Sequence, residues 1–237
     1  MPKKLEEDYF LEFAISSFCQ AKCPSCNRTN PETLEQQSWL TPEHFNIDTF
    51  KKMMSPDYWR SRKITKIKFC GENGDPMMHP KIQEFIDHSF LLGARSLTIA
   101  TNGGLRTPLW YKTMAEKYGK RLEIIFGIDG VTGEVSNKYR IGVDAARAYE
   151  NMFAFHNAGG YATWQFILFS FNYHQLPELY EICSKNRIAP SIIWNQGHYG
   201  LIDADMKLEV LNKYGDVLDA LRELQGEIVD ELAEDIS

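Results

Sequence analysis

Three cysteines lie within one stretch of eight residues, Cys19-Gln-Ala-Lys-Cys23-Pro-Ser-Cys26, directly after an apolar run. Thiols this close together are better suited to iron–sulfur chemistry than to a disulfide. A loop with this C-x3-C-x2-C spacing can supply thiolates to three irons of a [4Fe–4S] cluster. The fourth iron is then open, so the motif predicts a cluster that can bind a ligand other than protein.

Structural zinc is the competing interpretation of the same residues. It takes four protein ligands, typically as two pairs, such as C-x2-C with a second pair further along the chain. The remaining cysteines, Cys70 and Cys183, are far in sequence from each other and from the three-cysteine loop, and the first histidine after Cys26 is His44. The residues alone favour the iron–sulfur site and leave zinc open.

Length and composition limit the class of protein. A chain of 237 residues, 43% of them hydrophobic, can bury a core as one domain and is long enough for an α/β barrel or most of one. Its net charge of −6 gives no basic field for a nucleic-acid backbone, so nucleic acid is an unexpected partner. The sequence lacks an apolar stretch of the ~18 residues that a membrane span needs, and its bunched cysteines fit a reducing compartment. We expect a soluble, cytoplasmic protein.

Short apolar runs alternate with segments of helical spacing along most of the chain. Runs rich in Phe, Ile and Thr predict strands at 9–16, 64–70, 96–101, 122–128, 161–168 and 188–194. Helical spacing predicts helices at 42–54, 80–92, 108–118, 143–158 and 175–186. Thr41 is the expected N-cap of the first helix. Strands separated by helices predict an α/β fold with a parallel sheet and right-handed crossovers.

The unusual loops follow predicted strands, and ligands of parallel α/β sheets bind at that end of the strands. The three-cysteine loop follows the first strand. The next three strands are followed by Cys70-Gly-Glu-Asn-Gly-Asp-Pro76, Thr101-Asn-Gly-Gly104 and Gly127-Ile-Asp-Gly130. Each of these is an ordinary turn when taken alone. Because all of these loops are expected at the same edge of the sheet, we place the candidate site there.

These motifs resemble those of the radical S-adenosylmethionine (radical SAM) superfamily over roughly residues 9–195, and especially the core of its peptide-modifying and molybdopterin-type subgroup. The cysteine loop resembles the family's cluster motif, and Gly74-Asp75-Pro76 is similar to its Gly-Glu-Pro motif. Further similarity lies in Thr101-Asn102-Gly103, Ile128-Asp129-Gly130, Tyr139-Arg140-Ile141-Gly142 and the run from Asn172 to Leu179. The resemblance implies a partial (β/α)6 barrel.

The resemblance also implies a reaction. Cys19, Cys23 and Cys26 would hold a [4Fe–4S] cluster, and the amino and carboxylate groups of S-adenosylmethionine would bind the fourth iron. The reduced cluster cleaves S-adenosylmethionine, and the 5′-deoxyadenosyl radical abstracts a hydrogen atom from the substrate. An electron donor such as flavodoxin or ferredoxin is the implied partner. The substrate stays open between a peptide or protein side chain and a nucleotide or other small metabolite.

Several residues are expected to bind the cofactor. The resemblance implies that Asp75, with Glu72 able to share the role, contacts the methionine amino group, and that the guanidinium of Arg140 contacts the carboxylate. Trp194 and Asn195 end the sixth strand and could stack on and hydrogen-bond the adenine, although a tryptophan at a strand end can equally belong to the core. The full expected set is Gly71, Glu72, Gly74, Asp75, Thr101, Asn102, Arg140, Asn172, Trp194 and Asn195.

Two residues are candidates for a catalytic role. Asp129 is the candidate polar group near the target of the radical, although an aspartate in this context also forms turns. Cys70 is a candidate substrate-facing thiol, although a single cysteine at the end of a strand is more often a small buried apolar residue.

Two positions depart from the family pattern. Ser25 stands where an aromatic side chain often packs near the adenine, and Gly127 stands where a serine often contacts a cofactor hydroxyl. The first departure puts adenine contacts from the cysteine loop in doubt. The second removes a hydroxyl contact unless another group replaces it.

The C-terminal part of the chain bears on the number of clusters. No cysteine follows Cys183, so we expect a single cluster and no C-terminal auxiliary-cluster domain. Residues 206–236 have amphipathic spacing and predict one or two helices, with Gly226 as the place of a bend or break. We divide the chain into a core domain, 1–195, and a helical extension packed on it, 196–237. The alternative to an enzyme is a noncatalytic iron–sulfur or zinc-binding scaffold of the same fold.

Overall fold

A single parallel sheet organises the computed structural model, which describes residues 9–236. Its six strands are hydrogen-bonded in sequence order, and every neighbouring pair is parallel. The strands are β1 (Tyr9–Phe13), β2 (Ile64–Phe69), β3 (Ser96–Thr101), β4 (Leu122–Gly127), β5 (Tyr161–Leu168) and β6 (Ala189–Trp194). The sheet is open, with β1 and β6 at its two edges. This arrangement confirms the predicted α/β fold with a partial (β/α)6 barrel.

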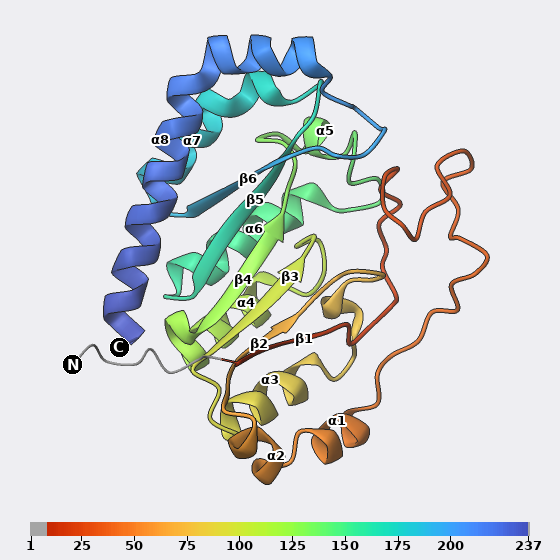
Figure 1. Cartoon of the computed structure of the whole chain (residues 1–237), viewed down its shortest axis with the longest axis vertical. Coiled ribbons are helices and arrows are strands. Elements are labelled where there is room, and N and C mark those ends of the chain that lie inside the picture. Colours follow the sequence, from red (N-terminus) through yellow and green to blue (C-terminus); the bar gives the residue numbers. More distant parts are fainter. Residues whose placement is uncertain (1–8, 237) are drawn as a thin grey trace.

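Helices connect the strands and cover one face of the sheet. They are α1 (Ile47–Met53), α2 (Pro56–Ser61), α3 (Ile82–Leu91), α4 (Pro108–Tyr118), α5 (Gly133–Ser136), α6 (Ala145–Asn157), α7 (Leu176–Asn186) and α8 (Ala204–Ile236). Short 3-10 turns lie at η1 (Pro76–Met78), η2 (Gly119–Arg121) and η3 (Tyr173–Gln175). Figure 1 shows α3, α4 and α6 behind the sheet, with the segment from β1 to α1 extending beyond the strand ends on one side.

Strand alternation separates an apolar face from a polar one. In β3, Leu97 and Ile99 are fully buried against the helices, whereas Thr98 on the other face is partly exposed. On that second face, the Glu123 carboxylate accepts hydrogen bonds from the hydroxyls of Thr98 and Thr163, each at 2.8 Å. The inner face of this open sheet is therefore polar, whereas a closed barrel fills its interior with apolar side chains.

The first helix begins later than predicted. The expected start at Pro42 with Thr41 as N-cap is wrong, because residues 43–45 form backbone contacts with residues 15–17, just after β1. Phe45 donates its N–H to the carbonyl of Ile15, and the Asn46 side chain caps α1 by accepting from two backbone N–H groups. The predicted first strand also ends early, at Phe13 rather than residue 16.

The C-terminal amphipathic segment forms one helix, α8, without a break at Gly226. Figure 1 shows that α8 changes direction along its length and then runs beside α7. It packs against β6 and α7, and its buried side chains Val210, Leu218 and Leu221 join the same hydrophobic core as the sheet. Leu211, on the same helix, is 41% exposed and lies outside this buried set. Within residues 9–236, no helix is both long and apolar enough to cross a membrane.

Candidate functional site

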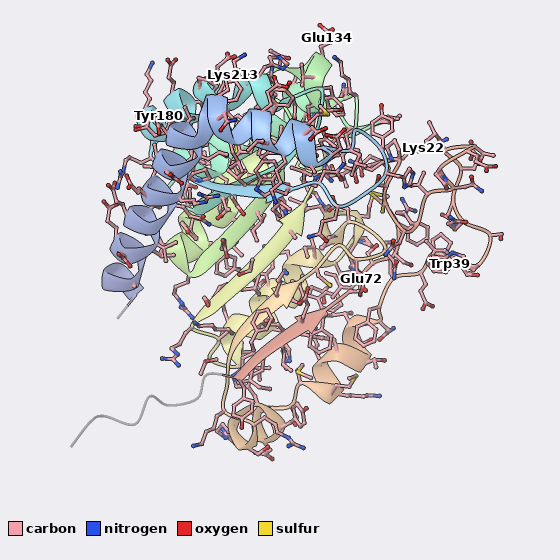
Figure 2. All side chains as sticks on the ribbon, turned by 45° about the horizontal axis from the view of Figure 1, so that its top comes forward. Lys22, Trp39, Glu72, Glu134, Tyr180 and Lys213 are labelled. Carbon is pink, nitrogen blue, oxygen red and sulfur yellow. The ribbon has the colours of Figure 1, made fainter. Side chains whose placement is uncertain are left out.

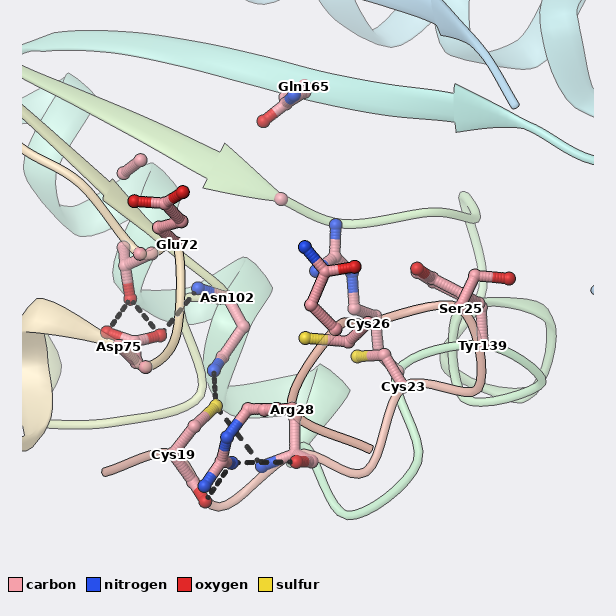
Figure 3. A pocket seen from close by; sticks show the side chains of 18 residues that line it. Cys19, Cys23, Ser25, Cys26, Arg28, Glu72, Asp75, Asn102, Tyr139 and Gln165 are labelled. Atoms are coloured by element: carbon pink, nitrogen blue, oxygen red, sulfur yellow. Dashed lines mark hydrogen bonds between the residues drawn. The ribbon is translucent and has the colours of Figure 1, made fainter. Parts of the chain in front are cut away.

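A cavity of about 340 Å³ lies at the carboxyl ends of the strands. Figure 3 shows its side chains, with the three cysteines on one side and Gln165 of β5 on the other. It is lined by Cys19, Ala21, Cys23, Ser25, Cys26, Asn27, Arg28, Gly71, Glu72, Gly74, Asp75, Ala100, Thr101, Asn102, Gly127, Tyr139, Arg140 and Gln165. The loops that the sequence singled out after β1, β2, β3 and β4 thus meet at one place.

Arg28 stabilises the conformation of the cysteine loop through hydrogen bonds to its backbone. Its Nη1 donates to the carbonyls of Cys19, at 2.8 Å, and Ala21, at 3.3 Å, and only 7% of the residue is exposed. The loop is tied to the rest of the fold by the N–H of Lys22, which donates to the carbonyl of Ile141 at 2.8 Å. Arg28 was not predicted as a site residue, because its only sequence signal is its position two residues after Cys26.

The thiols sit in an apolar pocket separate from the main core. Cys23 packs with Ala21, Tyr139, Val143 and Phe169, and Cys19 and Cys26 flank this cluster. Burial raises the pKa of the Cys19 thiol to about 12, assisted by the nearby Asp75 carboxylate. Burial likewise raises the pKa of Cys23, against the effect of Arg140. Without a cation the Cys19 and Cys23 thiols stay protonated at neutral pH, so metal binding to them must release protons.

Asp75 joins two loops rather than facing the cavity with a free carboxylate. It is 3% exposed and accepts from the N–H of Met77, the hydroxyl of Thr101 and the N–H of Asn102, all at 2.9 Å. Burial raises the pKa of this carboxyl, and these donors oppose the rise. Gly74 permits the close packing, since a Cβ there would lie 2.3 Å from the carbonyl oxygen of Ser16.

Glu72 presents the free carboxylate of the same loop. It is exposed and lines the cavity, and no hydrogen bond or ion pair to its carboxylate is made by any residue in the described range 9–236. Figure 2 shows Glu72 on the same side of the molecule as Lys22 and the exposed Trp39. A carboxylate in this position can form an ion pair with a positively charged group of a bound molecule.

Asn102 reaches the cysteine loop from the end of β3. Its Oδ1 accepts from Gln20 Nε2 at 2.8 Å, and its Nδ2 donates to the sulfur of Cys19 at 3.7 Å. The backbone N–H of Ala21 also donates to this sulfur, at 3.4 Å. Two N–H donors therefore point at one thiol, an arrangement that stabilises a thiolate. Gln20 was not predicted as a site residue, although it lies within the three-cysteine motif.

Arg140 is held by an ion pair with the fully buried Asp129. Its Nε lies 2.6 Å from Asp129 Oδ2, while Asp129 Oδ1 accepts from the N–H of Ile167 at 2.8 Å. Burial raises the pKa of Asp129, and Arg140 and Ile167 counter that rise. Burial disfavours the charged guanidinium, but Asp129 outweighs it and raises the pKa of Arg140, which stays charged. A Cβ at Gly127 would lie 2.7 Å from Arg140 Nη2, so the missing serine leaves room for the arginine.

Five predicted residues are absent from the lining of the cavity within residues 9–236: Cys70, Asp129, Asn172, Trp194 and Asn195. Asn172 is fully buried and its amide bonds the carbonyls of Asp129 and Ile167, which orders the backbone behind the site. Trp194 packs under the ammonium of Lys207. The amide of Asn195 bonds the carbonyls of Gly197 and Tyr199.

Ser25 contacts this 195–199 loop. Its Oγ accepts from the N–H of Tyr199 at 3.2 Å, and a Cβ on Gly197 would lie 2.5 Å from that oxygen. The space that an aromatic side chain would need is thus filled by backbone, which explains the small residue at this position.

The donor set fits an iron–sulfur cluster. Three thiols come from one loop, and no imidazole lines the cavity in the part of the chain that is described. No three His, Cys, Asp or Glu side chains among residues 9–236 converge closely enough to ligate a single metal ion. Zinc requires such convergence, with four ligands at ~2.0–2.3 Å from one ion. In a cubane each thiolate bonds a different iron, so the cysteines need not meet at one point.

Comparison with known proteins gives structural matches only. No protein-family model matches the chain, and no curated protein matches it in sequence. The structure of native anSMEcpe with bound AdoMet matches with a TM-score of 0.66 and 16% identity, over 87% of this chain and 59% of that one.

Two further structures match at lower scores. Methylornithine synthase (PylB) has a TM-score of 0.55 and 12% identity over 82% of this chain and 56% of its own. A radical SAM methyltransferase from Sphaerobacter thermophilus has a TM-score of 0.54 and 10% identity over 86% and 61%. The chain thus spans less than two thirds of each of the three proteins. The chain therefore shares the fold of these three proteins, one of which is a radical SAM methyltransferase, in agreement with the partial barrel that its motifs imply.

Proposed function

We propose that this protein is a radical SAM enzyme with a single [4Fe–4S] cluster held by Cys19, Cys23 and Cys26. The observation that carries the proposal is the meeting of the three thiols, the Gly-Asp-Pro turn and Arg140 at one cavity. When bound, the cluster and S-adenosylmethionine supply reductive cleavage and a 5′-deoxyadenosyl radical that abstracts hydrogen from the substrate. The residues of the chain bind, orient and shield these groups.

Two of the charged side chains that line the cavity, Arg140 and Glu72, are complementary to the two ends of an amino acid. Arg140 is charged and oriented by Asp129, so it suits the carboxylate of the methionine part. Glu72 has a free carboxylate and suits the amino group. Asp75 acts through position, because its carboxylate already accepts from three donors and fixes Asn102 beside Cys19.

The apolar cluster around the thiols shields Cys23 from water, whereas Cys19 and Cys26 are partly exposed at the cavity. Tyr139 is 7% exposed and packs on Phe169 with ring centroids 4.5 Å apart. Low local polarity strengthens the interaction of the N–H donors with the Cys19 sulfur and keeps competing hydrogen donors away.

Our proposal for the substrate class rests only on the structural similarity to anSMEcpe. The anSMEcpe structures include complexes with AdoMet and a peptide, Cp18Cys or Kp18Cys. A peptide or protein side chain is therefore our first proposal for the substrate, with a nucleotide or other small metabolite as the second. An electron donor such as flavodoxin or ferredoxin would reduce the cluster.

Paired cysteine variants test the proposal. Cys23→Ala should abolish iron binding and the formation of 5′-deoxyadenosine after anaerobic reconstitution, because it removes one of three cluster ligands. Cys183→Ala is the matched control, since this thiol is fully buried in the main core, away from the cavity. Equal loss from both variants would mean that the ligands are assigned wrongly. A protein that binds zinc and no iron would favour the noncatalytic scaffold.

A further inference from the structure

Arg28 is a buried cation without an ionic partner. The residue is 7% exposed and lines the cavity on the cysteine side, beside Cys19 (Figure 3). No carboxylate in the described range 9–236 forms an ion pair with its guanidinium. The guanidinium of Arg140, which lines the same cavity, differs in this respect, because Asp129 pairs with it at 2.6 Å. A buried charge is costly unless an opposite charge compensates for it, so the position of Arg28 points to an anionic occupant of the cavity.

The hydrogen bonds of Arg28 go to neutral groups and leave one donor unused. Its Nη1 donates to the carbonyls of Cys19 and Ala21, and its Nη2 donates to Oε1 of Gln36 at 3.3 Å. Four buried side-chain nitrogen or oxygen atoms lack a partner within residues 9–236, and Nε of Arg28 is the one that belongs to a residue of the cavity lining. These neutral partners fix the position of the charge but do not neutralise it.

The segment after the cysteine loop keeps the guanidinium in place. The amide of Gln36 is itself oriented, because its Nε2 donates to the carbonyl of Leu40 at 2.8 Å and leaves Oε1 for Arg28. Thr29 and Gln36 also form an antiparallel bridge, which holds Gln36 close to the cysteine loop. A guanidinium stays charged at every relevant pH, so the fold maintains a permanent positive charge next to the thiols.

We infer that Arg28 is the fixed positive charge that balances the cluster and raises its reduction potential; this inference rests on the proposed function. Three thiolates on a [4Fe–4S]²⁺ core leave one net negative charge. The electron received from the donor adds a second negative charge, and no bond forms or breaks. Arg28 stabilises the state with the larger negative charge more strongly, and net charge is one of the quantities that set the potential of a cluster. Arg28 therefore acts through the cluster rather than on the substrate.

Two variants separate the charge of Arg28 from its hydrogen bonds. Arg28→Gln keeps an amide donor for the backbone carbonyls but removes the charge, whereas Arg28→Lys keeps the charge and loses the fork. The midpoint potential of the anaerobically reconstituted protein is measured without S-adenosylmethionine, by a redox titration followed by electron paramagnetic resonance. Arg222→Gln is the matched control, because the Arg222 side chain is 60% exposed on α8 and lies outside the cavity lining. Circular dichroism and iron content verify that each variant folds and holds its cluster.

The expected result is a loss of reducibility in one variant only. At a fixed potential, Arg28→Gln should lower the ratio of reduced to oxidised cluster about tenfold, which corresponds to a midpoint about 59 mV more negative. A unit charge has at least this effect at a separation of up to about 10 Å when the effective dielectric constant is about 20. Arg28→Lys should stay close to the unaltered protein, and Arg222→Gln should not differ from it.

The other outcomes each decide the inference. An unchanged midpoint in Arg28→Gln, or equal shifts in Arg28→Gln and Arg28→Lys, would overturn it and leave Arg28 as a structural clamp of the loop. Uptake of iron by Arg28→Lys but not by Arg28→Gln would support it, because the charge would then be needed even for assembly of the cluster. Uptake by neither variant would overturn it, since the fork and not the charge would be required.

Failure of the proposed function gives a different result, because the potential is measured without S-adenosylmethionine. If the unaltered protein holds a reducible cluster whose signal S-adenosylmethionine leaves unchanged, the proposed function fails while the shift in Arg28→Gln still tests the role of the charge. If the unaltered protein takes up no iron, both fail.

Discussion

The buried ion pair between Asp129 and Arg140 holds the guanidinium at the edge of the cavity. Asp129→Asn keeps one oxygen for the N–H of Ile167 but turns an amide N–H toward Arg140 Nε, 2.6 Å away. Removing one partner of a buried pair costs about 3–5 kcal/mol. The Arg140 side chain is 17% exposed and borders the cavity, so water can partly replace the carboxylate, and we expect about 3 kcal/mol.

Urea unfolding followed by circular dichroism measures this loss. With an m-value of about 2–3 kcal/mol/M, the midpoint should fall by roughly 1 M or more. Asp219→Asn is the matched control: Asp219 pairs with Arg222 at 2.5 Å, but the two side chains are 68% and 60% exposed. Exposed pairs contribute about 0–1 kcal/mol, so this midpoint should barely move. Equal shifts for the two variants would refute the reasoning that Asp129 holds Arg140 in place.

Three further perturbations probe other parts of the molecule. Asn102→Ala removes an N–H that points at the Cys19 sulfur, so the cluster's reduction potential, measured by redox titration, should become more negative; a rise would contradict the assigned role. Ser25→Phe places a ring against Gly197 and should lower cluster content after reconstitution, whereas Ser25→Ala should retain it. Burial lowers the pKa of His156, so the unfolded chain binds the proton more readily and stability should fall as the pH drops below ~6.5. The dependence of the urea midpoint on pH should be weaker in His156→Gln, and an unchanged dependence would exclude His156 as its source.

Much of the fold could be predicted because local signals and tertiary structure agree. The helix at 108–118 and the strand at 161–168 have the predicted bounds, and Thr107 caps the helix as its position before Pro108 suggests. The start of α1 was mispredicted because Thr41 and Asn46 are both good caps. The contact of Phe45 with Ile15 decides between them, and that contact is long-range.

Two helices escaped prediction because of their length. The α2 and α5 helices have six and four residues, which is too short to show periodicity. The starts of these helices are nevertheless marked in the sequence, because the side chains of Ser55 and Thr132 are their N-caps.

Site residues that lie in sequence motifs could be predicted. Those whose position depends on the pairing between strands could not. The three thiols share one loop, and Asp75 and Asn102 each lie in a motif that is typical of a turn. The structure places all of them around one cavity. Gln165 needed the register of β5, although its place between buried Trp164 and Phe166 is a signal of an inward-facing polar residue. Trp194 ends β6 and Asn195 follows it, at the same end of the sheet as the other site loops, but their contacts are with Lys207 and the backbone of the 197–199 segment.

The electron paramagnetic resonance spectrum of the reduced protein, with and without S-adenosylmethionine, tests the central claim most directly. Anaerobic reconstitution should load about four irons per chain on the three cysteines. Dithionite should then give a [4Fe–4S]⁺ signal that changes when S-adenosylmethionine is added, because one iron has no protein ligand. A colourless protein that holds zinc, or an iron signal that saturating S-adenosylmethionine leaves unchanged, would contradict the account.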